Sequence, residues 1–389
     1  MGDNSTWIDH PEAVTEPGMV ITVGFLTYYT IIFCIALGGN TLVIVAIWKY
    51  QRMRTVVNLF LANLALSDFM FVLLSIMDCV TFIKREWIFG DALCRIQGAL
   101  IEVSYTVSIL TLVAVSAERY LAICWPHRRK RSVRDTVVVM VVVWVTAVCI
   151  CAVLVYAYTV KMVDGALKCE NSYWSDEARL YFYLIHSAIV YLLPLGTMVF
   201  AHYKISRAIT RSENTIKAAK SKVSSCSICL RCIGDCSNDG EYTSPLDNGN
   251  YPDHKKSPHS FRPRSAIIKG SLNRNKETLA SVRRRQRIIK LLCAVTLTFF
   301  IMWSPFIVTR IVMYAGLNLN RFIWLSTQLL VFSSTASNCI IYACMSPRFR
   351  ESFGILLKCN KREKFNVWTN SSAEVSETSK KQVTGKTCV

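Results

Sequence analysis

Residues 107–120 read VSILTLVAVSAERY, an apolar run that ends in a neighbouring acid and base, Glu118 and Arg119. Charged side chains at the end of an apolar helix are costly in hydrocarbon, so this pair predicts a functional role. The chain holds seven apolar stretches of about 20 residues or more, the length that crosses a bilayer. They lie near 20–48, 56–82, 92–124, 136–160, 180–209, 286–313 and 321–344.

Backbone polar groups inside hydrocarbon must be hydrogen-bonded internally, so these stretches predict helices. We expect an all-α membrane protein with a seven-transmembrane helix bundle over 20–345 and a short amphipathic eighth helix over 346–359. Residues 1–19 are expected to form an extracellular N-terminus, and 360–389 a cytoplasmic tail. Within the bundle, the polar composition of about 210–282 predicts a disordered third cytoplasmic loop.

The distribution of charge indicates the orientation in the membrane. The 389 residues are 52% apolar and carry a formal charge of +19. Basic residues crowd the loops after the first, third and fifth stretches, whereas the alternate loops are balanced or acidic. The positive-inside rule therefore places the basic loops in the cytoplasm and the N-terminus outside, as in a plasma-membrane protein. This pattern indicates that the chain is associated with a lipid bilayer. It does not indicate a nucleic-acid partner for the basic loops.

Two N-terminal motifs compete. Residues 1–6 fit a myristoylation pattern, which needs a cytosolic end, while Asn4-Ser5-Thr6 is a glycosylation sequon, which needs an external one. The charge bias favours glycosylation of Asn4.

Several motifs occur in order, one set per stretch. They are Gly39-Asn40, Leu61 to Asp68, Glu118-Arg119-Tyr120, Trp144, Pro194, Phe299-x-x-x-Trp303-x-Pro305 and Asn338-x-x-x-Tyr342. With these motifs in this order the chain resembles a rhodopsin-like G-protein-coupled receptor over roughly Met19 to Cys359, and Trp87-x-Phe89-Gly90 is similar to the neuropeptide-receptor subgroup. The resemblance implies an extracellular ligand, a heterotrimeric G protein whose nucleotide exchange the receptor catalyses, and arrestin. No nucleophile–base pair or phosphate loop predicts an enzyme.

The resemblance assigns a switch to part of this set. Arg119 is expected to rest against Glu118 and to swing toward a partner on activation, although a static ion pair is the alternative. Phe299 and Trp303 share a helix face, and Pro305 predicts a bend beside them, although core packing explains them too. The remaining switch candidates are Tyr120, Asn338 and Tyr342, with Cys339 standing where the family usually has proline.

A second polar set surrounds Asp68. The resemblance implies an allosteric Na⁺ site, and hard oxygen ligands suit such a cation. The alternative is a polar residue hydrogen-bonded to its neighbours without an ion. No other metal and no cofactor is expected. The candidates are Asn40, Asp68, Ser108, Ser334, Thr335 and Asn338.

The cysteines suggest several modifications. Cys94 and Cys169 lie in the predicted extracellular part, where disulfides persist, and are expected to pair. Cys359 follows the amphipathic run and is a palmitoylation candidate. The spacing of Cys226, Cys229, Cys232 and Cys236 leaves an iron–sulfur cluster, zinc, acylation or plain solvation open. Thr387-Cys388-Val389 fits a PDZ-binding terminus.

The ligand is expected to be a peptide. Ile101 stands where aminergic relatives carry an acid, and 321–344 has no lysine for a retinal Schiff base. The outer rim is rich in charged and aromatic residues, which suits an extended peptide, although solvated loop surface explains each charge individually. A lipid or other non-peptide ligand, and a secondary transporter, are the alternatives. The ligand-binding candidates are Ile101, Glu102, Tyr105, Arg179, Trp303 and Arg310.

Overall fold

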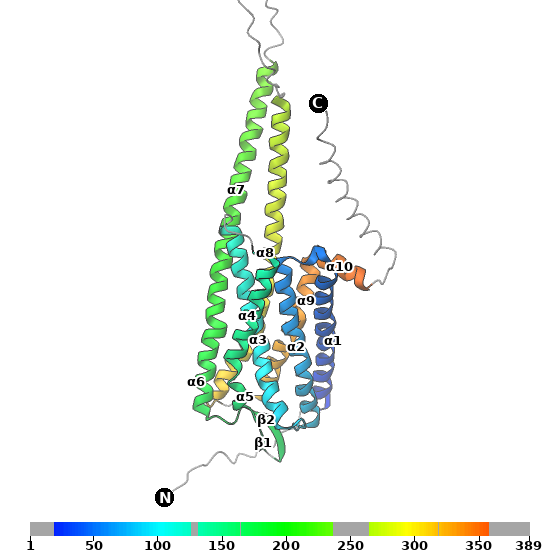
Figure 1. The fold of residues 1–389 in the computed structure, drawn as a ribbon, viewed down its shortest axis with the longest axis vertical. Helices are drawn as coiled ribbons and strands as arrows, with labels where there is room; N and C mark the ends of the chain where they lie inside the picture. Colours follow the sequence, from blue (N-terminus) through cyan, green and yellow to red (C-terminus); the bar gives the residue numbers. More distant parts are fainter. Residues whose placement is uncertain (1–18, 126–130, 164, 236–263, 318, 358–389) are drawn as a thin grey trace, which may run out of the picture. The chain divides into compact units, whose positions relative to one another are not determined.

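The computed structural model describes residues 19–125, 131–163, 165–235, 264–317 and 319–357 (Figure 1). Within them, seven helical segments are long and apolar enough to cross a membrane, which confirms the predicted seven-helix fold. Most bounds differ from the predicted ones by a few residues. The spans are Met19–Lys49 (α1), Val56–Lys84 (α2), Gly90–Cys124 (α3), Val133–Ala157 (α4 and α5), Asp176–Ala218 (α6, η2 and part of α7), Val282–Tyr314 (in α8) and Phe322–Met345 (in α9).

The chain divides into two compact units. The first consists of Met1–Glu118, Arg129–Val199 and Leu291–Val389, and the second of Arg119–Arg128 and Phe200–Lys290. The long helices α3, α7 (Leu193–Asp235) and α8 (Arg264–Tyr314) each contribute residues to both units.

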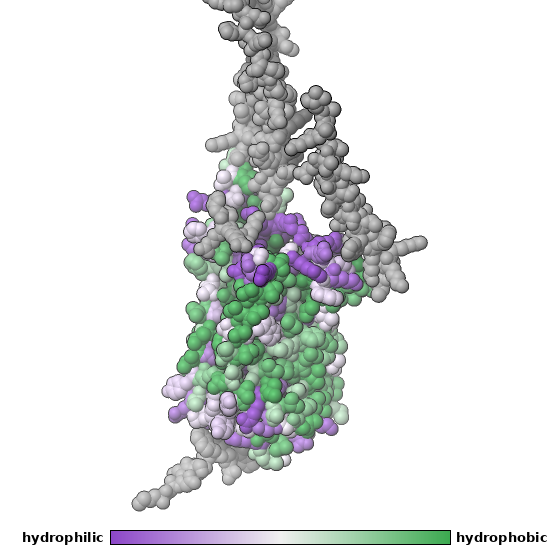
Figure 2. All heavy atoms as spheres, in the orientation of Figure 1, coloured by the Kyte–Doolittle hydropathy of each residue, from purple (hydrophilic) through white to green (hydrophobic). Residues whose placement is uncertain are grey.

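The outer faces of the helices are apolar. Val138, Val142 and Val145 of α4 (Val133–Cys151) are each more than half exposed. Figure 2 shows hydrophobic residues covering much of the visible flank of the helices, with hydrophilic residues gathered toward their ends. Lipid tails solvate such a surface, whereas water does not, so these faces fit a membrane environment.

Helix α1 packs against α2 and α9 (Arg321–Met345) in the first unit. Helices α1 and α9 approach closely at Gly39, where an added Cβ would lie 2.3 Å from Cys339 Sγ. Only glycine fits this contact, in keeping with the small residues common at membrane helix interfaces. The Cys339 thiol donates to the carbonyl of Ala336 at 3.0 Å, and α9 runs through this position as one helix.

A chain of side-chain hydrogen bonds joins α2, α3 and α4. The Trp144 indole donates to Asn63 Oδ1 at 2.9 Å, and Asn63 Nδ2 donates to Thr111 Oγ1 at 2.8 Å. Each donor thus finds an acceptor inside the bundle, which removes the cost of burying these polar groups.

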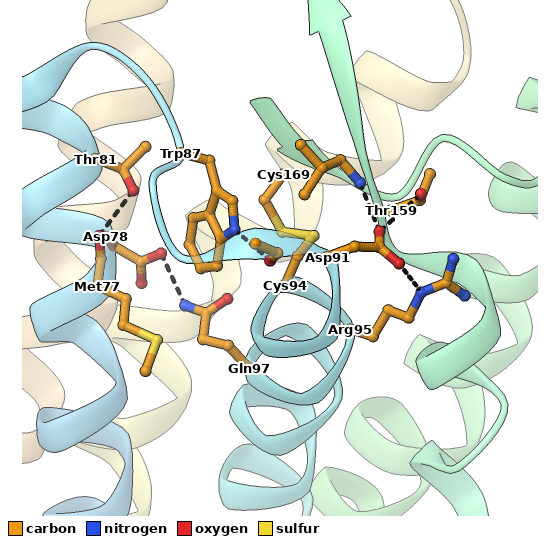
Figure 3. Close-up of a disulfide and its surroundings, with 12 residues drawn as sticks. Met77, Asp78, Thr81, Trp87, Asp91, Cys94, Arg95, Gln97, Thr159 and Cys169 are labelled. Carbon is orange, nitrogen blue, oxygen red and sulfur yellow. Dashed lines mark hydrogen bonds and ion pairs between the residues drawn. A yellow bond between two sulfur atoms is a disulfide. The ribbon is translucent and has the colours of Figure 1, made fainter. Parts of the chain in front are cut away.

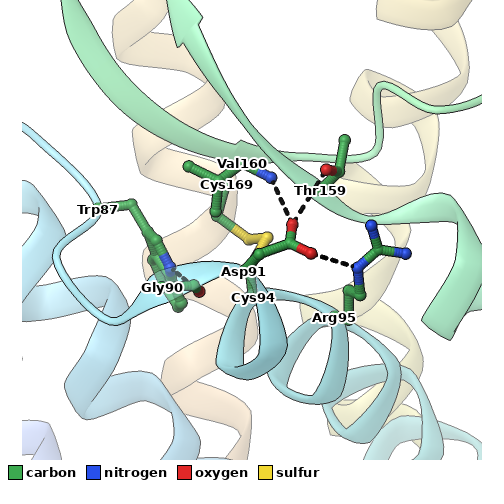
Figure 4. Close-up of polar contacts among 8 residues, drawn as sticks. All are labelled: Trp87, Gly90, Asp91, Cys94, Arg95, Thr159, Val160 and Cys169. Atoms are coloured by element: carbon green, nitrogen blue, oxygen red, sulfur yellow. Dashed lines mark hydrogen bonds and ion pairs between the residues drawn. A yellow bond between two sulfur atoms is a disulfide. The ribbon is translucent and has the colours of Figure 1, made fainter.

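A β-hairpin covers the end of α3 where that helix begins. Strands β1 (Thr159–Val163) and β2 (Ala166–Glu170) pair antiparallel, and a disulfide joins Cys169 of β2 to Cys94 of α3, as expected. Figure 4 shows a second connection, in which Asp91 accepts from Val160 N and Thr159 Oγ1, both at 3.0 Å. We refer to this end of the first unit as the disulfide end.

The fifth span contains a π-helical turn. It runs through α6 (Asp176–Ser187), η2 (Ala188–Leu192) and then α7. Pro194 lies two residues after the end of η2 and has no N–H to donate, so the carbonyls one turn earlier cannot all be paired in the α pattern. The wider turn is therefore located where proline interrupts the ladder.

The predicted eighth helix is present as α10 (Pro347–Leu357), after α9. Phe349 of α10 is buried and stacks on Tyr342 with ring centroids 5.5 Å apart. Arg52 of the 3₁₀ turn η1 (Gln51–Met53) forms an exposed ion pair with Glu351 at 3.0 Å. The apolar face of α10 thus packs on the bundle while its charged face stays outside.

The range 210–282, predicted to be a disordered loop, contains the end of α7, which extends to Asp235, and the start of α8 at Arg264. In the second unit, Glu213 pairs with Lys217 at 2.9 Å one turn along α7, and Gln286 of α8 donates to Glu213 at 2.9 Å. Such i, i+4 pairs support a helix in a polar sequence. Residues 236–263 lie outside the described part of the chain.

Candidate functional site

An aromatic floor surrounds Trp303 inside the first unit. Its ring stacks on Tyr105 of α3 at 4.2 Å and on Phe299 at 5.4 Å, and Phe71 of α2 meets it edge-on at 6.0 Å. Phe299 and Trp303 therefore share a face of α8, with Pro305 inside the same helix. The Trp303 indole donates to Ser334 Oγ at 3.0 Å, which connects α8 to α9. A shift of α8 would have to break this bond or move α9 with it.

A buried ion pair joins Glu102 of α3 to Arg310 of α8. Their side chains are 7% and 6% exposed, so neither charge reaches bulk solvent. The Arg310 guanidinium also lies over the Tyr183 ring at 4.1 Å and the Phe306 ring at 5.1 Å. Because each charge is a large desolvation cost without its partner, the two side chains stabilise each other's position.

This pairing was not predicted. Sequence reasoning named Glu102 and Arg310 as separate ligand-binding candidates and did not connect them. The residues are 208 positions apart, and they meet because both lie on inward faces of their helices.

Several polar atoms in and around the Glu102–Arg310 pair are not used in hydrogen bonds within the part of the chain that the structure describes. Glu102 Oε2, Arg310 Nε and both ring nitrogens of His186 are buried and have no hydrogen-bond partner among the described residues. His186 lies 6.4 Å from Tyr105 between ring centroids. We call Glu102, Tyr105, Tyr183, His186 and Arg310 the charged cluster. Buried polar atoms without partners are rare in folded proteins, so these atoms are candidates for hydrogen bonds to a polar ligand.

Sequence reasoning missed Tyr183 and His186. Both lie on α6, three residues apart and thus on one face of the helix. A lone histidine in an apolar stretch is the signal that could have indicated this face.

Arg179 lies farther out on α6. It donates to the carbonyl of Asn171 at 2.8 Å, pairs with Asp176, and lies over the Tyr314 ring at 5.3 Å. Ile101, the remaining ligand-binding candidate, is half-buried on α3 next to Glu102. The candidates therefore reach from the floor at Trp303 to the disulfide end.

A chain of hydroxyl groups continues from the charged cluster to the loop. Asn171 Nδ2 donates to the Tyr183 hydroxyl at 3.1 Å, and Tyr158 also hydrogen-bonds Tyr183. Burial, together with the neighbouring Tyr183 and Tyr314, holds the pKa of Tyr158 well above its usual range. Tyr158 thus keeps its proton as a donor. Its ring packs so closely on Gly98 of α3 that an added Cβ would lie 2.7 Å from it.

The polar set around Asp68 is only partly connected by direct bonds. Asn338 donates to Asp68 at 2.8 Å, and Asn40 donates to the carbonyl of Thr335 at 3.1 Å. Ser108 bonds Ser67 at 2.9 Å and the carbonyl of Ser104 at 3.0 Å. Ser334 receives the Trp303 indole and Thr335 donates within its own helix.

The oxygen atoms of this set fit a small hard cation. Asn40 Oδ1 is buried without a hydrogen-bond partner among the described residues, and the Asp68 carboxylate is buried beside a neutral amide. Carboxylate, amide and hydroxyl oxygens are the ligands that such cations take.

Glu118 forms an ion pair with Arg131 at 3.2 Å, a partner that sequence reasoning did not assign. In the second unit, Tyr120 lies near Phe200 with ring centroids 6.4 Å apart. The Tyr342 hydroxyl is buried and has no partner among the described residues. Arg119 belongs to the second unit.

The modification motifs cannot be placed. Asn4, Cys236, Cys359 and the terminus Thr387-Cys388-Val389 lie outside the described residues, and Cys226, Cys229 and Cys232 lie in a part of α7 whose side chains are not described.

The chain is similar to known seven-transmembrane receptors. The family model described as 7 transmembrane receptor (rhodopsin family) matches residues 39–342. A QRFP-like peptide receptor of Branchiostoma floridae is 25% identical over 348 residues, which cover 86% of this chain and 77% of that protein. The substance-K receptor of Homo sapiens is 27% identical over 342 residues, which cover 86% of this chain and 72% of that protein. A cholecystokinin receptor of Xenopus laevis is 29% identical over 359 residues, which cover 86% of this chain and 77% of that protein.

Proposed function

The chain belongs to the rhodopsin family of seven-transmembrane receptors, and we propose that it is activated by a peptide that enters from the disulfide end. It is a multi-pass plasma-membrane protein and a signalling receptor, and G-protein coupling is the function of its family. The similar proteins named as receptors for peptides support a peptide ligand here.

The observation that carries the proposal is the charged cluster. A lipid would bury hydrocarbon against its site, but here a buried ion pair and an unpartnered histidine would face that hydrocarbon. Leaving such groups without hydrogen bonds costs about 1–3 kcal/mol each. A peptide supplies carbonyls, amides and charged groups that satisfy them. The cluster therefore favours a peptide over the lipid alternative.

The transduction step follows from the contacts of Trp303. A peptide that binds the charged cluster reaches Arg310 of α8 and Tyr105 of α3, and Tyr105 stacks on Trp303. If the peptide binds better when α8 has moved, the population shifts toward that state. A G protein that binds the same state then couples reciprocally to the peptide.

The orientation belongs to this proposal. From the basic loops we infer that the disulfide end faces outside the cell and that α10 lies in the cytoplasm. At the cytoplasmic side, Arg119 contacts the G protein in the active state, and arrestin binds the same face. Asp68 and Asn338 would hold a Na⁺, whose charge would stabilise the inactive state, and a PDZ domain would bind Thr387-Cys388-Val389.

A ligand screen tests the proposal. Cells that express the wild type or Arg119→Ala are exposed to a peptide library and, separately, to a lipid library, with calcium and cyclic-nucleotide readouts. We expect peptides, and not lipids, to give a response that Arg119→Ala abolishes while surface expression is retained. A response to lipids alone refutes the peptide ligand. Uptake of a radiolabelled solute into vesicles without any G-protein response would support a transporter instead.

A further inference from the structure

Each of three acids near the disulfide end has a cation beside it. Glu102 pairs with Arg310, Asp91 with Arg95 at 2.6 Å, and Asp176 with Arg179. Their charges are therefore offset within the protein.

Asp78 of α2 differs from these acids. Its carboxylate accepts a hydrogen bond from Gln97 Nε2 of α3 at 2.9 Å, and Gln97 is a neutral amide (Figure 3). No ion pair of Asp78 is found within the described part of the chain. Figure 3 shows this pair beside the disulfide, with Trp87 over it.

Asp78 points into the bundle. It continues the inward stripe of α2 that passes through Asp68, Phe71 and Ser75, at spacings of three and four residues. Its partner Gln97 is 5% exposed, so the hydrogen bond lies on the interior side of α3. Asp78 itself is nevertheless exposed. The interior between these helices is therefore open to water at Asp78.

Two helices lead from this acid to the aromatic floor. Phe71 of α2 and Tyr105 of α3 both contact Trp303. Asp78 is two turns from Phe71 along α2, which is about 10 Å, and Gln97 is eight residues from Tyr105 along α3, which is about 12 Å. An extended peptide covers this distance with three to four residues, at about 3.3–3.6 Å each.

We propose that Asp78, held by Gln97, binds a cationic group of the ligand, a Lys or Arg side chain or a free amino terminus, about three to four residues from the group that reaches Trp303. This inference rests on the proposed peptide ligand, and it assigns the cationic group to Asp78 because Arg310 already offsets the charge of Glu102. Asp78 is then the acid that determines specificity for a basic ligand.

The first experiment measures peptide specificity. A positional-scanning library of hexapeptides, with free and acetylated amino termini, is applied to cells that express the full chain. We expect the wild type to prefer Lys, Arg or a free amino terminus at one position. Asp78→Asn should weaken those peptides about 10- to 100-fold while neutral ones change less than about 3-fold, and Asp78→Lys should reverse the preference toward Asp or Glu. Glu86→Gln, an exposed loop acid near α2, is the matched control.

If Asp78→Asn lowered the potency of all peptides equally, Asp78 would have a structural role and the proposal would be overturned. An unchanged preference for basic peptides in Asp78→Asn would also overturn it. If no peptide activates the wild type, the proposed peptide ligand fails, and a second experiment still tests Asp78.

That experiment needs no ligand. A cysteine at Ile101, one turn inward of Gln97 on the same face of α3, is modified by a cationic and by an anionic methanethiosulfonate, with the chain lacking this cysteine as background. We expect Asp78→Asn to lower the ratio of cationic to anionic modification rates by about tenfold, while Glu86→Gln leaves it unchanged. An unchanged ratio in Asp78→Asn would show that this carboxylate attracts no cation to the site.

Discussion

Removing one member of the Glu102–Arg310 pair should destabilise the receptor far more than removing both. The side chains are 7% and 6% exposed, so Glu102→Gln leaves the Arg310 charge buried without a counterion. Such a loss costs about 3–5 kcal/mol. Arg310→Met leaves the Glu102 charge and also removes the cation–π contact at 4.1 Å from Tyr183, worth about 1–2 kcal/mol when desolvated.

The double variant Glu102→Gln/Arg310→Met removes both charges and keeps similar volumes. Replacing a buried pair by residues of similar shape is often neutral, so we expect the double variant to approach the wild type. The coupling energy of the cycle should then be about 3 kcal/mol or more, a change of over a hundredfold in the folded ratio. For comparison, whole domains are stable by only about 5–15 kcal/mol.

The assay is unfolding of the purified receptor in mixed micelles by titration with sodium dodecyl sulfate, followed by circular dichroism. Asp176→Asn is the control. Asp176 also forms an ion pair, with Arg179, but its side chain is 76% exposed, and exposed pairs contribute at most about 1 kcal/mol to stability. Additive effects of Glu102→Gln and Arg310→Met, with no coupling, would refute the buried pair.

Two further predictions concern contacts of α9. Gly39→Ala should lower the melting temperature, because the new Cβ would lie 2.3 Å from Cys339 Sγ, whereas Gly38→Ala has nothing within 4 Å and should be harmless. Thermal unfolding in nanodiscs checks this, and an unaffected Gly39→Ala would mean that α1 and α9 are not packed so closely. Ser334→Ala should raise ligand-free nucleotide exchange a few-fold. The variant loses the 3.0 Å hydrogen bond from Trp303, which destabilises the state in which Trp303 is bonded to α9 by about 1 kcal/mol. No change in basal exchange would indicate that the bond persists in both states.

The membrane-spanning helices could be predicted because length and hydropathy are local properties of the sequence. The Val-rich part of α4 is helical despite its β-propensity, since hydrocarbon requires internal hydrogen bonding. Likewise, the contact of Phe299 with Trp303 follows from their spacing on one helix.

The partners of the charged residues could not be predicted in this way. Glu102 with Arg310, Asp78 with Gln97 and Glu118 with Arg131 depend on which helix faces meet, and periodicity does not specify that. The helical extension of α7 to Asp235 was missed because a polar composition was taken to indicate disorder, although i, i+4 pairs can stabilise a polar helix.

The most direct test of a peptide-activated receptor is nucleotide exchange by purified heterotrimeric G proteins on nanodiscs that contain this chain. An active peptide from the screen should accelerate GTPγS binding on the wild type. The double variant Glu102→Gln/Arg310→Met should fold yet need at least about tenfold more peptide, because the charged cluster has lost its ionic contacts to the ligand. Equal peptide potency on both proteins would contradict the account, since the ligand would then bind without the charged cluster.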